Sequence, residues 1–422
     1  MRKVSRGVLT ILLSATVLSA CSGGGQELSE RLEAVKIEFS KEKKQLEAEL
    51  TALKEEVQGN FYYQQLDTDK ERRVYLQFVN GLSKRMQVID IDSVNDEIYS
   101  RVYFSVAHDY PEFYWLTDEA AMAGGIDILD LEEPVYPSDL SPTQNKIEDE
   151  VNKILAQTPK GSDYEKVKYF YEVIIKQTDY DLEALQTKSV TWRSQGITSV
   201  LLDKKSVCAG YSRTFQYLCK KAGIDCIYVT GIAKNGQNGE FGHAWNLVKI
   251  NGQYYGVDTT WGDPVFDQAI SGEAHTDISY DYLCVPDEIL ERGRIADTDL
   301  LDYWGEEQYY EPRALTYPKC TDNSLNYYVQ KGVYFTSFDE AAVLQSITDQ
   351  RLQGTDKVVL QFGTAEAMQQ MITLASTENN AIFQVLGDVG EYQYYYNDQT
   401  YTFELADWFY GISLNLKERV LP

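Results

Sequence analysis

The stretch HAWNLVKINGQYYGVDTTW, residues 243–261, constrains the fold of this chain more than any other. Apolar and polar residues alternate on both sides of Asn251-Gly252, which is the pattern of two antiparallel strands joined by a two-residue turn. A turn of this kind fixes the register, so that counting outward from it pairs Trp245 with Asp258. The sequence therefore predicts a β-hairpin whose facing residues can be named.

His243 lies on the same face of the first strand as Trp245, because side chains alternate along a strand. Asp258 is then a diagonal neighbour of His243 on that face, at a backbone separation of roughly 7–8 Å that longer side chains can bridge. A carboxylate in contact with an imidazole fixes the tautomer of the ring and stabilises its protonated form. We therefore expect His243 and Asp258 to meet.

A second stretch, residues 206–223, places a cysteine at the start of a predicted helix. Apolar residues recur with helical spacing from Val207 to Leu218, and Gly223 ends the pattern. At a helix N-terminus, unbonded backbone N–H groups and the helix dipole stabilise a thiolate, and one N–H can bind an oxyanion. The sequence predicts that Cys208 is a nucleophile.

The motifs SVCAGYS at 206–212 and GHAWNLVKINGQYYGVDTTWGDP at 242–264 resemble the transglutaminase-like superfamily, and the resemblance extends over residues 140 to 290. It implies a papain-like α+β core, in which the helix carrying the cysteine packs on an antiparallel sheet carrying the histidine and the aspartate. It also implies that Cys208 is the nucleophile, His243 the general base and acid, and Asp258 the orienting carboxylate. We expect no cofactor and no metal.

Four further residues draw attention. Gln195 precedes a short helix upstream of Cys208, where family members often place a glutamine, and it could donate a hydrogen bond to the oxyanion; the alternative is a surface-loop glutamine. Trp245 and Trp261 are expected to wall the substrate cleft or to pack in the core. Ser206 departs from the family pattern, because a glycine is common two residues before the cysteine.

The remaining histidines and cysteines indicate no second reactive centre. We expect His108 to cap a helix or to pack in the core, and His275 to lie in an exposed loop. Cysteines after position 21 are too sparse for a dense disulfide framework and form no CxxC zinc pattern; they are Cys208, Cys219, Cys226, Cys284 and Cys320. A disulfide from Cys208 to Cys219 or Cys226 would silence the thiol.

Residues 1–20 have the pattern of a targeting segment. A basic start, MRKVSR, precedes the apolar run GVLTILLSATVLSA, which is too short to span a membrane comfortably. The following Cys21 completes the LSAC sequence typical of bacterial lipoprotein signals, in which the cysteine is lipidated after cleavage. We therefore expect an extracytoplasmic protein that a lipid on Cys21 anchors to a bacterial membrane; an ordinary secretory signal is the alternative.

Composition sets the class of partner and the number of domains. The formal net charge of −26 argues against nucleic-acid binding and against a protein lying flat on an anionic membrane. Apolar residues with helical spacing predict a stalk at 21–58, either a short coiled coil that self-associates or a solitary helix. The rest of the 422 residues divides into a helical region at 59–135, a catalytic domain at 136–315 and an accessory α+β domain at 316–422.

Local signals refine two of these parts. Ser141-Pro142 predicts a helix start with Ser141 as its cap, and Ser162 with Glu165 forms a capping box. In the accessory domain we expect strands at 326–335, 357–362 and 381–386, followed by a strand pair around Asn397-Asp398.

The sequence thus predicts acyl transfer through a thioester on Cys208, with a peptide bond or a glutamine side-chain amide as the donor. Water as acceptor would make the protein a peptidase or amidase, and an amine would make it a cross-linking transferase. The extracytoplasmic setting favours hydrolysis of a peptide or protein at the cell surface. A metal site built from Cys208, His243 and Asp258 is an alternative with few ligands, and a non-catalytic binding or scaffold lipoprotein is another.

Overall fold

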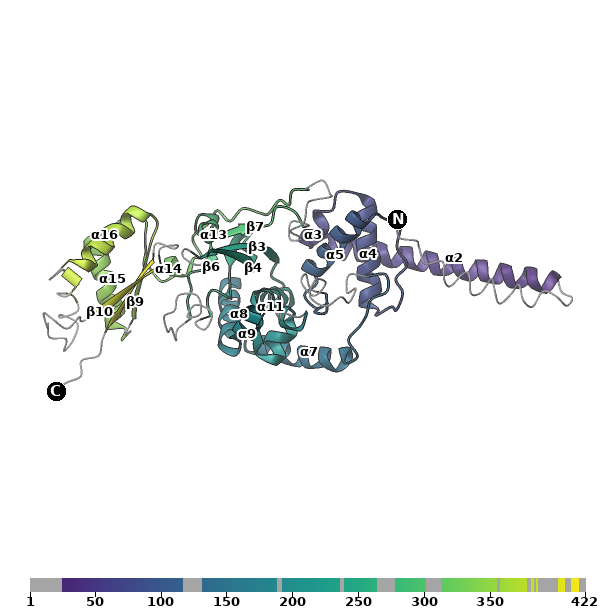
Figure 1. The fold of residues 1–422 in the computed structure, drawn as a ribbon, viewed down its shortest axis with the longest axis horizontal. Helices are drawn as coiled ribbons and strands as arrows, with labels where there is room; N and C mark the ends of the chain where they lie inside the picture. Colours follow the sequence, from purple (N-terminus) through teal and green to yellow (C-terminus); the bar gives the residue numbers. More distant parts are fainter. Residues whose placement is uncertain are drawn as a thin grey trace.

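The computed structural model describes residues 25–116, 131–187, 192–235, 239–263, 278–300, 313–354, 357–377, 381–382, 385, 401–406 and 411–416. Within these residues the chain is a mixed α+β protein, as predicted, and its parts lie in a row (Figure 1). A helical region comes first, a five-stranded sheet with its helices lies in the middle, and a smaller four-stranded sheet follows. None of the described helices combines the length and the apolar character needed to cross a membrane.

The N-terminal region is helical. Its elements are α2 Gly25–Glu56, η1 Val57–Gly59, α3 Phe61–Gln64, α4 Asp69–Ser83 and α5 Asp96–Asp109. Helix α4 begins with a capping box, in which the Thr68 hydroxyl accepts the Glu71 N–H and the Glu71 carboxylate accepts the Thr68 N–H. The side chain of Asn95 caps α5 by accepting the N–H of Ile98.

Helix α2 projects from the rest of the molecule (Figure 1) and runs without interruption through the charged segment around Glu42. Leu50, near its C-terminal end, is buried in the main core. Ile37 and Phe39, in the projecting part, are 64% and 56% exposed. The helix therefore has the form of a stalk, whereas its self-association stays a prediction. Residues 1–20 and Cys21 lie outside the described residues.

The central part begins with helices and a small parallel strand pair. These elements are α7 Leu140–Gln157, α8 Asp163–Gln177, β1 Asp179–Tyr180, α9 Leu182–Thr187, α10 Trp192–Gln195, η2 Ser199–Asp203, β2 Lys205–Ser206 and α11 Cys208–Lys221. The capping box of Ser162 and Glu165 at the start of α8 is confirmed. The prediction of Ser141 as the cap of α7 is wrong: the helix begins at Leu140 after Asp139, and the N–H of Thr143 closes the first turn on the Asp139 carbonyl.

A five-stranded antiparallel sheet follows. It consists of β3 Cys226–Asn235, β4 Gly239–Ile250, β5 Gln253–Val257, β6 Leu283–Val285 and β7 Arg294–Ala296, in the order β6-β5-β4-β3-β7. The predicted β4–β5 hairpin is confirmed from the Ile250–Gln253 pair to the Asn246–Val257 pair. Its turn residues Asn251 and Gly252 have φ angles of 52° and 82°, which is why the turn needs this dipeptide.

The two faces of the sheet carry different elements. On one face Asn246 donates a hydrogen bond to the Ser212 carbonyl of α11 over 3.1 Å. On the other face lies α13 (Asp287–Gly293), whose Leu290 packs so closely on Gly256 that an added Cβ there would collide with it. Gly231 lets β7 and the tip of the Trp245 ring approach β3, because a Cβ at this position would lie 2.1 Å from the Ile295 carbonyl oxygen.

The N-terminal helices are bonded directly to the central part. Gln216 of α11 donates a hydrogen bond to the carbonyl of His108 at the end of α5, over 2.8 Å. Arg101 of α5 forms a buried two-point ion pair with Asp299, which lies just after β7, at distances of 2.7 and 3.0 Å. Buried apolar residues of both parts form one continuous core, so the described N-terminal helices and the sheet support each other.

The C-terminal part has its own small core, around Val343, Ile347, Leu360 and Met371. Its elements are α14 Tyr327–Gln330, β8 Tyr334–Phe335, α15 Glu340–Leu352, β9 Lys357–Phe362, α16 Ala365–Ser376, β10 Tyr401–Ala406 and β11 Gly411–Leu416. The sheet order is β10-β11-β9-β8.

Two predicted strands of this part are wrong, and one is confirmed. Residues 326–335 contain a helical turn and only a two-residue strand, because the Asn326 side chain accepts the N–H of Tyr328 and starts α14. Positions 381, 382 and 385 are helical rather than extended. The strand at 357–362 is present as β9. The turn at Asn397-Asp398 lies outside the described residues, and β10 pairs with β11.

Candidate active site

Cys208 is the first residue of α11 and is half-buried. Val207 is the N-cap residue and supplies no side-chain cap, so the first backbone N–H groups of the helix are not satisfied by that residue's side chain. No disulfide joins the five described cysteines, and Cys208 is therefore a thiol. A thiol in this position meets the first requirement of a nucleophile at a helix N-terminus.

The loop before Cys208 is fixed by hydroxyl groups. Ser206 is fully buried, its Oγ lies 2.6 Å from the Ser199 Oγ, and it donates to the Ser194 carbonyl over 3.2 Å. Gly210 makes this possible, since a Cβ there would lie 2.1 Å from the Ser206 Oγ. The serine that departs from the family pattern is thus held in a bonded site, and the space it needs comes from the glycine at 210.

A hydrogen bond sets the position of α11 against β4. The Ser212 hydroxyl donates to the Ala244 carbonyl over 2.9 Å, and both groups are buried. Cys208 and Ser212 are four residues apart, so they lie on the same side of the helix one turn from each other. Ala244 is the residue after His243. The α11 helix is therefore fixed against β4 at the residue after His243, and Cys208 lies one helical turn before this contact.

His243 and Asp258 meet as the hairpin register predicts. The His243 Nε2 lies 2.8 Å from the Asp258 Oδ2, and the exposed fractions of the two side chains are 1% and 0%. The other carboxylate oxygen, Oδ1, accepts the backbone N–H groups of Thr260 and Trp261 over 3.1 and 3.2 Å. The Asp258 carboxylate is therefore bonded through both of its oxygens. Nδ1 is the nitrogen of the His243 ring that does not contact Asp258.

Burial and charge act on both members of this pair. Burial lowers the pKa of His243 below its ordinary value; the Asp258 carboxylate opposes this shift and the Arg294 cation adds to it. Burial alone would raise the pKa of Asp258, but His243 and Arg294 together hold it well below its usual range. Asp258 is therefore ionised and His243 is neutral near pH 7, which are the states that a base and its orienting carboxylate require.

Arg294, the first residue of β7, also belongs to this site and was not predicted. Its Nε and Nη2 donate to the Asp258 Oδ2 over 2.9 and 2.7 Å. Its guanidinium lies between two aromatic rings, 4.0 Å from the centre of Trp261 and 4.2 Å from that of Tyr282. Arg294 is 36 residues beyond Asp258 and stands on a three-residue strand, too short for an alternation pattern to place its side chain.

Gln195 ends α10 and is buried, so the surface-loop alternative is wrong for this residue. Its Nε2 is buried and has no hydrogen-bond partner among the described residues. The preceding residue, Ser194, accepts the N–H of Val207 through its carbonyl over 3.3 Å, which brings the end of α10 to the residue before Cys208. The end of α10, which carries this buried amide donor, thus lies beside the residue that precedes Cys208.

The two predicted tryptophans have different surroundings. Trp261 is half-buried, stacks on Phe241 at 5.8 Å between ring centres and meets the His243 ring edge-on at 5.3 Å. Trp245 is 2% exposed and stacks on His243 at 6.1 Å. Trp261 and Phe241 therefore form an aromatic wall beside His243, and sequence reasoning missed Phe241. Trp245 packs beneath the histidine.

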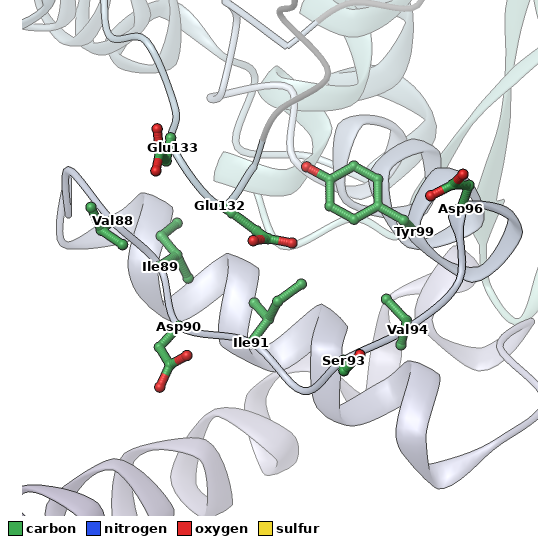
Figure 2. A pocket seen from close by; sticks show the side chains of 10 residues that line it. All are labelled: Val88, Ile89, Asp90, Ile91, Ser93, Val94, Asp96, Tyr99, Glu132 and Glu133. Atoms are coloured by element: carbon green, nitrogen blue, oxygen red, sulfur yellow. The ribbon is translucent and has the colours of Figure 1, made fainter. Parts of the chain in front are cut away.

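Two of the cavities in the described part of the chain differ widely in size. One, of about 550 Å³, lies on the α13 face of the sheet and is lined by Trp245, Leu290, Arg294 and the segment 315–319, among others. The second, of about 30 Å³, lies in the helical region, where residues of the segment 88–99 and the pair Glu132 and Glu133 line it (Figure 2). It holds no more than about one water molecule. Its acidic side chains project from separate segments and do not converge on one point.

The other titratable candidates lie away from this site. His108 is buried, with its ring against those of Tyr62 and Tyr228 at 4.8 and 5.0 Å, so it packs in the core. His275 lies outside the described residues. The described part of the chain holds no group of three or more His, Cys, Asp or Glu side chains arranged to bind a metal. The 2.8 Å contact of His243 with Asp258 is that of a direct hydrogen bond.

Comparison with known proteins follows the same segment of the chain. Residues 152–259 match the model of the transglutaminase-like superfamily. Kyphoscoliosis peptidase from mouse is 33% identical over 142 residues, which are 32% of this chain and 21% of the mouse protein. The human protein of the same name is 30% identical over 174 residues, covering 39% of this chain and 25% of that protein. The chain thus spans a quarter or less of the length of these relatives.

Solved structures show weaker likeness. A transglutaminase crystal structure matches at 20% identity with a TM-score of 0.27, over 40% of this chain and 41% of the other. A Cytophaga hutchinsonii protein, proposed to be a cysteine protease, matches at 20% identity with a TM-score of 0.23, over 35% and 49% of the two chains. Cys208, His243 and Asp258 all lie within residues 152–259, the segment that matches the transglutaminase-like superfamily model.

Proposed function

We propose that the protein is a thiol enzyme that transfers acyl groups from amide bonds through a thioester on Cys208. The observation that carries this proposal is the buried His243–Asp258 hydrogen bond, beside the N-terminal turn of the helix that begins with Cys208. A nucleophile at a helix N-terminus, a base and a carboxylate that orients the base are the three parts that such chemistry needs.

The proposed reaction begins at the thiol. Because the Nε2–H of His243 donates a hydrogen bond to the Asp258 carboxylate, Nδ1 is the nitrogen that accepts the proton of the Cys208 thiol. The sulfur attacks the amide carbon, the carbonyl oxygen becomes an oxyanion, and the amine leaves with the proton from Nδ1. A water molecule then gives a proton to Nδ1 and attacks the thioester, which releases the acid and restores the thiol.

Two donors support the oxyanion in this proposal. One is the backbone N–H of Cys208, at the positive end of α11. The other is the buried Nε2 of Gln195, whose lack of a hydrogen-bond partner among the described residues leaves it available to a substrate oxygen. A donor that is held ready before the substrate binds stabilises the transition state without reorganisation.

We propose hydrolysis of peptide amides rather than amine transfer, because the curated relatives over this segment are named as peptidases. The proposed setting is the outer face of a bacterial membrane, with a lipid on Cys21 as the anchor and α2 as a stalk. The substrate is then a peptide or a protein at the cell surface. The aromatic wall of Trp261 and Phe241 suits an apolar side chain of that substrate.

The first test is the reactivity of the thiol in the full-length protein, purified in detergent. Iodoacetamide should modify Cys208 faster than Cys226 at pH 6, since both are half-buried and only Cys208 lies at a helix N-terminus. His243→Gln should reduce the difference, because the variant keeps the helix N-terminus and loses the base. Mass spectrometry of the two peptides gives both rates in one sample. Equal rates in the unaltered protein would favour a binding protein with an idle site.

The second test shows whether water or an amine accepts the acyl group. A peptide library is incubated with the protein, with and without dansylcadaverine, and the products are identified by mass. Cleaved peptides or deamidated glutamines indicate hydrolysis, whereas dansyl adducts indicate amine transfer. Cys208→Ala should remove either product, and Cys226→Ala should leave it. Adducts without cleavage would overturn the hydrolytic assignment.

A further inference from the structure

Arg294 makes the closest charged contacts to the carboxylate that orients His243. The Asp258 Oδ2 accepts three donors, His243 Nε2 at 2.8 Å and Arg294 Nε and Nη2 at 2.9 and 2.7 Å. The Arg294 side chain is 1% exposed, and its Nη1 donates to the Tyr282 hydroxyl over 3.1 Å and to the Gly293 carbonyl over 2.9 Å. All three guanidinium nitrogens are therefore bonded, which fixes the group in the plane between two aromatic rings.

We propose that Arg294 is a positioning residue of the active site: it holds Asp258 in the orientation that receives His243, and its charge sets the pH range in which the Cys208–His243 pair works. This inference rests on the function proposed above and extends it to a residue of another strand. Arg294 does not touch the reacting atoms, because Asp258 stands between it and the imidazole.

The geometry explains why an arginine stands at this position. With Oδ1 bonded to two backbone N–H groups and Oδ2 to two guanidinium nitrogens, the carboxylate cannot rotate away from Nε2. A lysine has one nitrogen and could not bond Asp258 and Tyr282 while stacking between Trp261 and Tyr282. The cation also lowers the pKa of His243, so its removal should move proton transfer to higher pH.

Other charged and titratable groups surround this cluster and must be held constant in any test. Helix α8 contributes Tyr171, and the segments after β5 and before β6 contribute Asp263, Asp281 and Tyr282. Helix α13 contributes Asp287 and Glu291, the segment after β7 contributes Asp297, and the segment 315–319 contributes Lys319. Lys319 pairs with Asp287 and Glu291. None of these groups is altered in the variants below.

The chain provides a matched control for a merely structural role. Arg101 and Asp299 form a second buried two-point pair, with side-chain exposures of 4% and 3% and contacts of 2.7 and 3.0 Å. It joins α5 to the segment after β7 and includes none of the proposed catalytic residues. Arg101→Gln and Arg294→Gln should lower the melting temperature alike, because each leaves a buried carboxylate without its cation.

One measurement separates a positioning role of Arg294 from a merely structural one. It is the pH profile of Cys208 alkylation by iodoacetamide in the full-length protein. Arg294→Gln should shift the profile to higher pH by roughly one unit, the size expected for removal of one neighbouring charge. It should also lower kcat for the best library peptide without raising KM. Arg294→Lys keeps the charge, so its profile should stay in place while kcat falls. Arg101→Gln should change neither the pH profile of Cys208 alkylation nor kcat.

Chemical rescue provides a second measurement. Arg294 lines the cavity of about 550 Å³, so its truncation opens a route by which a small cation can reach Asp258. Methylguanidine at millimolar concentration should restore both the alkylation profile and kcat of Arg294→Ala, whereas methylammonium, which supplies the charge without the two-point contact, should restore the profile alone. If Arg294→Ala does not fold, Arg294→Lys decides: a fall in kcat supports the proposal and an unchanged kcat contradicts it.

The failure of this inference can be told from the failure of the proposed function. If Cys208 of the unaltered protein reacts no faster than Cys226, the function itself is wrong. If Cys208 is fast but Arg294→Gln and Arg101→Gln give the same profile as the unaltered protein, Arg294 is only structural.

Discussion

The hydroxyl of Ser212 donates a hydrogen bond to the carbonyl of Ala244 over 2.9 Å, in the interior of the protein. This bond joins the helix that begins with Cys208 to the strand that carries His243, one helical turn from the cysteine. Asn246 adds a second bond between the same two elements, to the Ser212 carbonyl. The helix that begins with Cys208 and the strand that carries His243 are thus joined by two bonds to backbone carbonyls, and neither bond involves an ionisable side chain.

Asp258→Asn should lower the rate of Cys208 chemistry by roughly 10²–10⁴-fold, because an amide in place of the carboxylate cannot hold the required tautomer of His243. It should also lower the free energy of unfolding by about 3–5 kcal/mol, because Arg294 loses its buried partner. Peptide hydrolysis and urea unfolding measure the two effects. Asp299→Asn is the control: it removes the two-point carboxylate partner of Arg101, which also contacts Glu97 at 3.4 Å, and it should destabilise the protein without slowing Cys208.

Gln195→Ala should lower kcat by roughly 10²–10³-fold, the usual loss when one oxyanion donor is removed. The melting temperature should change little, because the Nε2 of Gln195 has no hydrogen-bond partner among the described residues. The control is Gln361→Ala in the C-terminal sheet, where a buried glutamine Nε2 also has no such partner. A Gln195→Ala protein with full kcat would remove this residue from the site.

Gly252→Ala should destabilise the protein by about 1–2 kcal/mol, since its φ of 82° is in the left-handed region that a side chain disfavours. The ladder from Ile250–Gln253 to Asn246–Val257 should keep the register, so Cys208 should remain reactive below the melting temperature. Gly59→Ala is the matched control, because a Cβ there has nothing within 4 Å and its φ is not positive. Loss of Cys208 reactivity in folded Gly252→Ala would show that the turn, and not the ladder, fixes the register.

Asp109 should make the protein less stable as the pH rises from about 4 to 6. Burial raises the pKa of its carboxyl from 3.8 to about 6, against the hydrogen bonds from Tyr75, Tyr62 and Tyr63. The folded state therefore binds the proton more tightly than the unfolded state, and the free energy of unfolding falls over this range by up to about 3 kcal/mol from this group.

Asp109→Asn tests this assignment. The variant should be less stable at pH 4, because an amide nitrogen would face a backbone or hydroxyl donor that the carboxyl now accepts. Its free energy of unfolding should lack the fall between pH 4 and 6. Urea unfolding of both proteins at several pH values gives the difference between them, and a difference that is constant with pH would contradict the prediction.

The part of the site that could be predicted from the sequence is the part encoded locally. The turn at Asn251-Gly252 sets its own backbone angles, and alternation carries the register outward from it, so the meeting of His243 and Asp258 needed no distant information. Cys208 could be placed for the same reason, because the apolar spacing and Gly223 delimit a single helix. Short-range geometry sufficed in both cases.

Arg294 could not be found in this way. Arg294 reaches Asp258 only because β7 pairs with β3 as the edge strand of the sheet, and Gly231 permits that approach. Sequence spacing does not reveal which short segment supplies an edge strand. In the C-terminal part, residues 326–335 are rich in tyrosine and valine, which predicts a strand, but the side-chain bond of Asn326 turns the backbone into α14 instead. There a single local bond overrides the average preference of the segment.

The segment that matches the superfamily, residues 152–259, ends one residue after Asp258. It includes Cys208 and His243, yet it stops before β7 and begins after α5, which holds α11 through the bond of Gln216 to the His108 carbonyl. The stretch that matches the superfamily model is therefore smaller than the stretch whose buried residues form one continuous core. A fragment cut at the borders of the match would keep Cys208, His243 and Asp258 and lose Arg294 and the bond from Gln216 to α5.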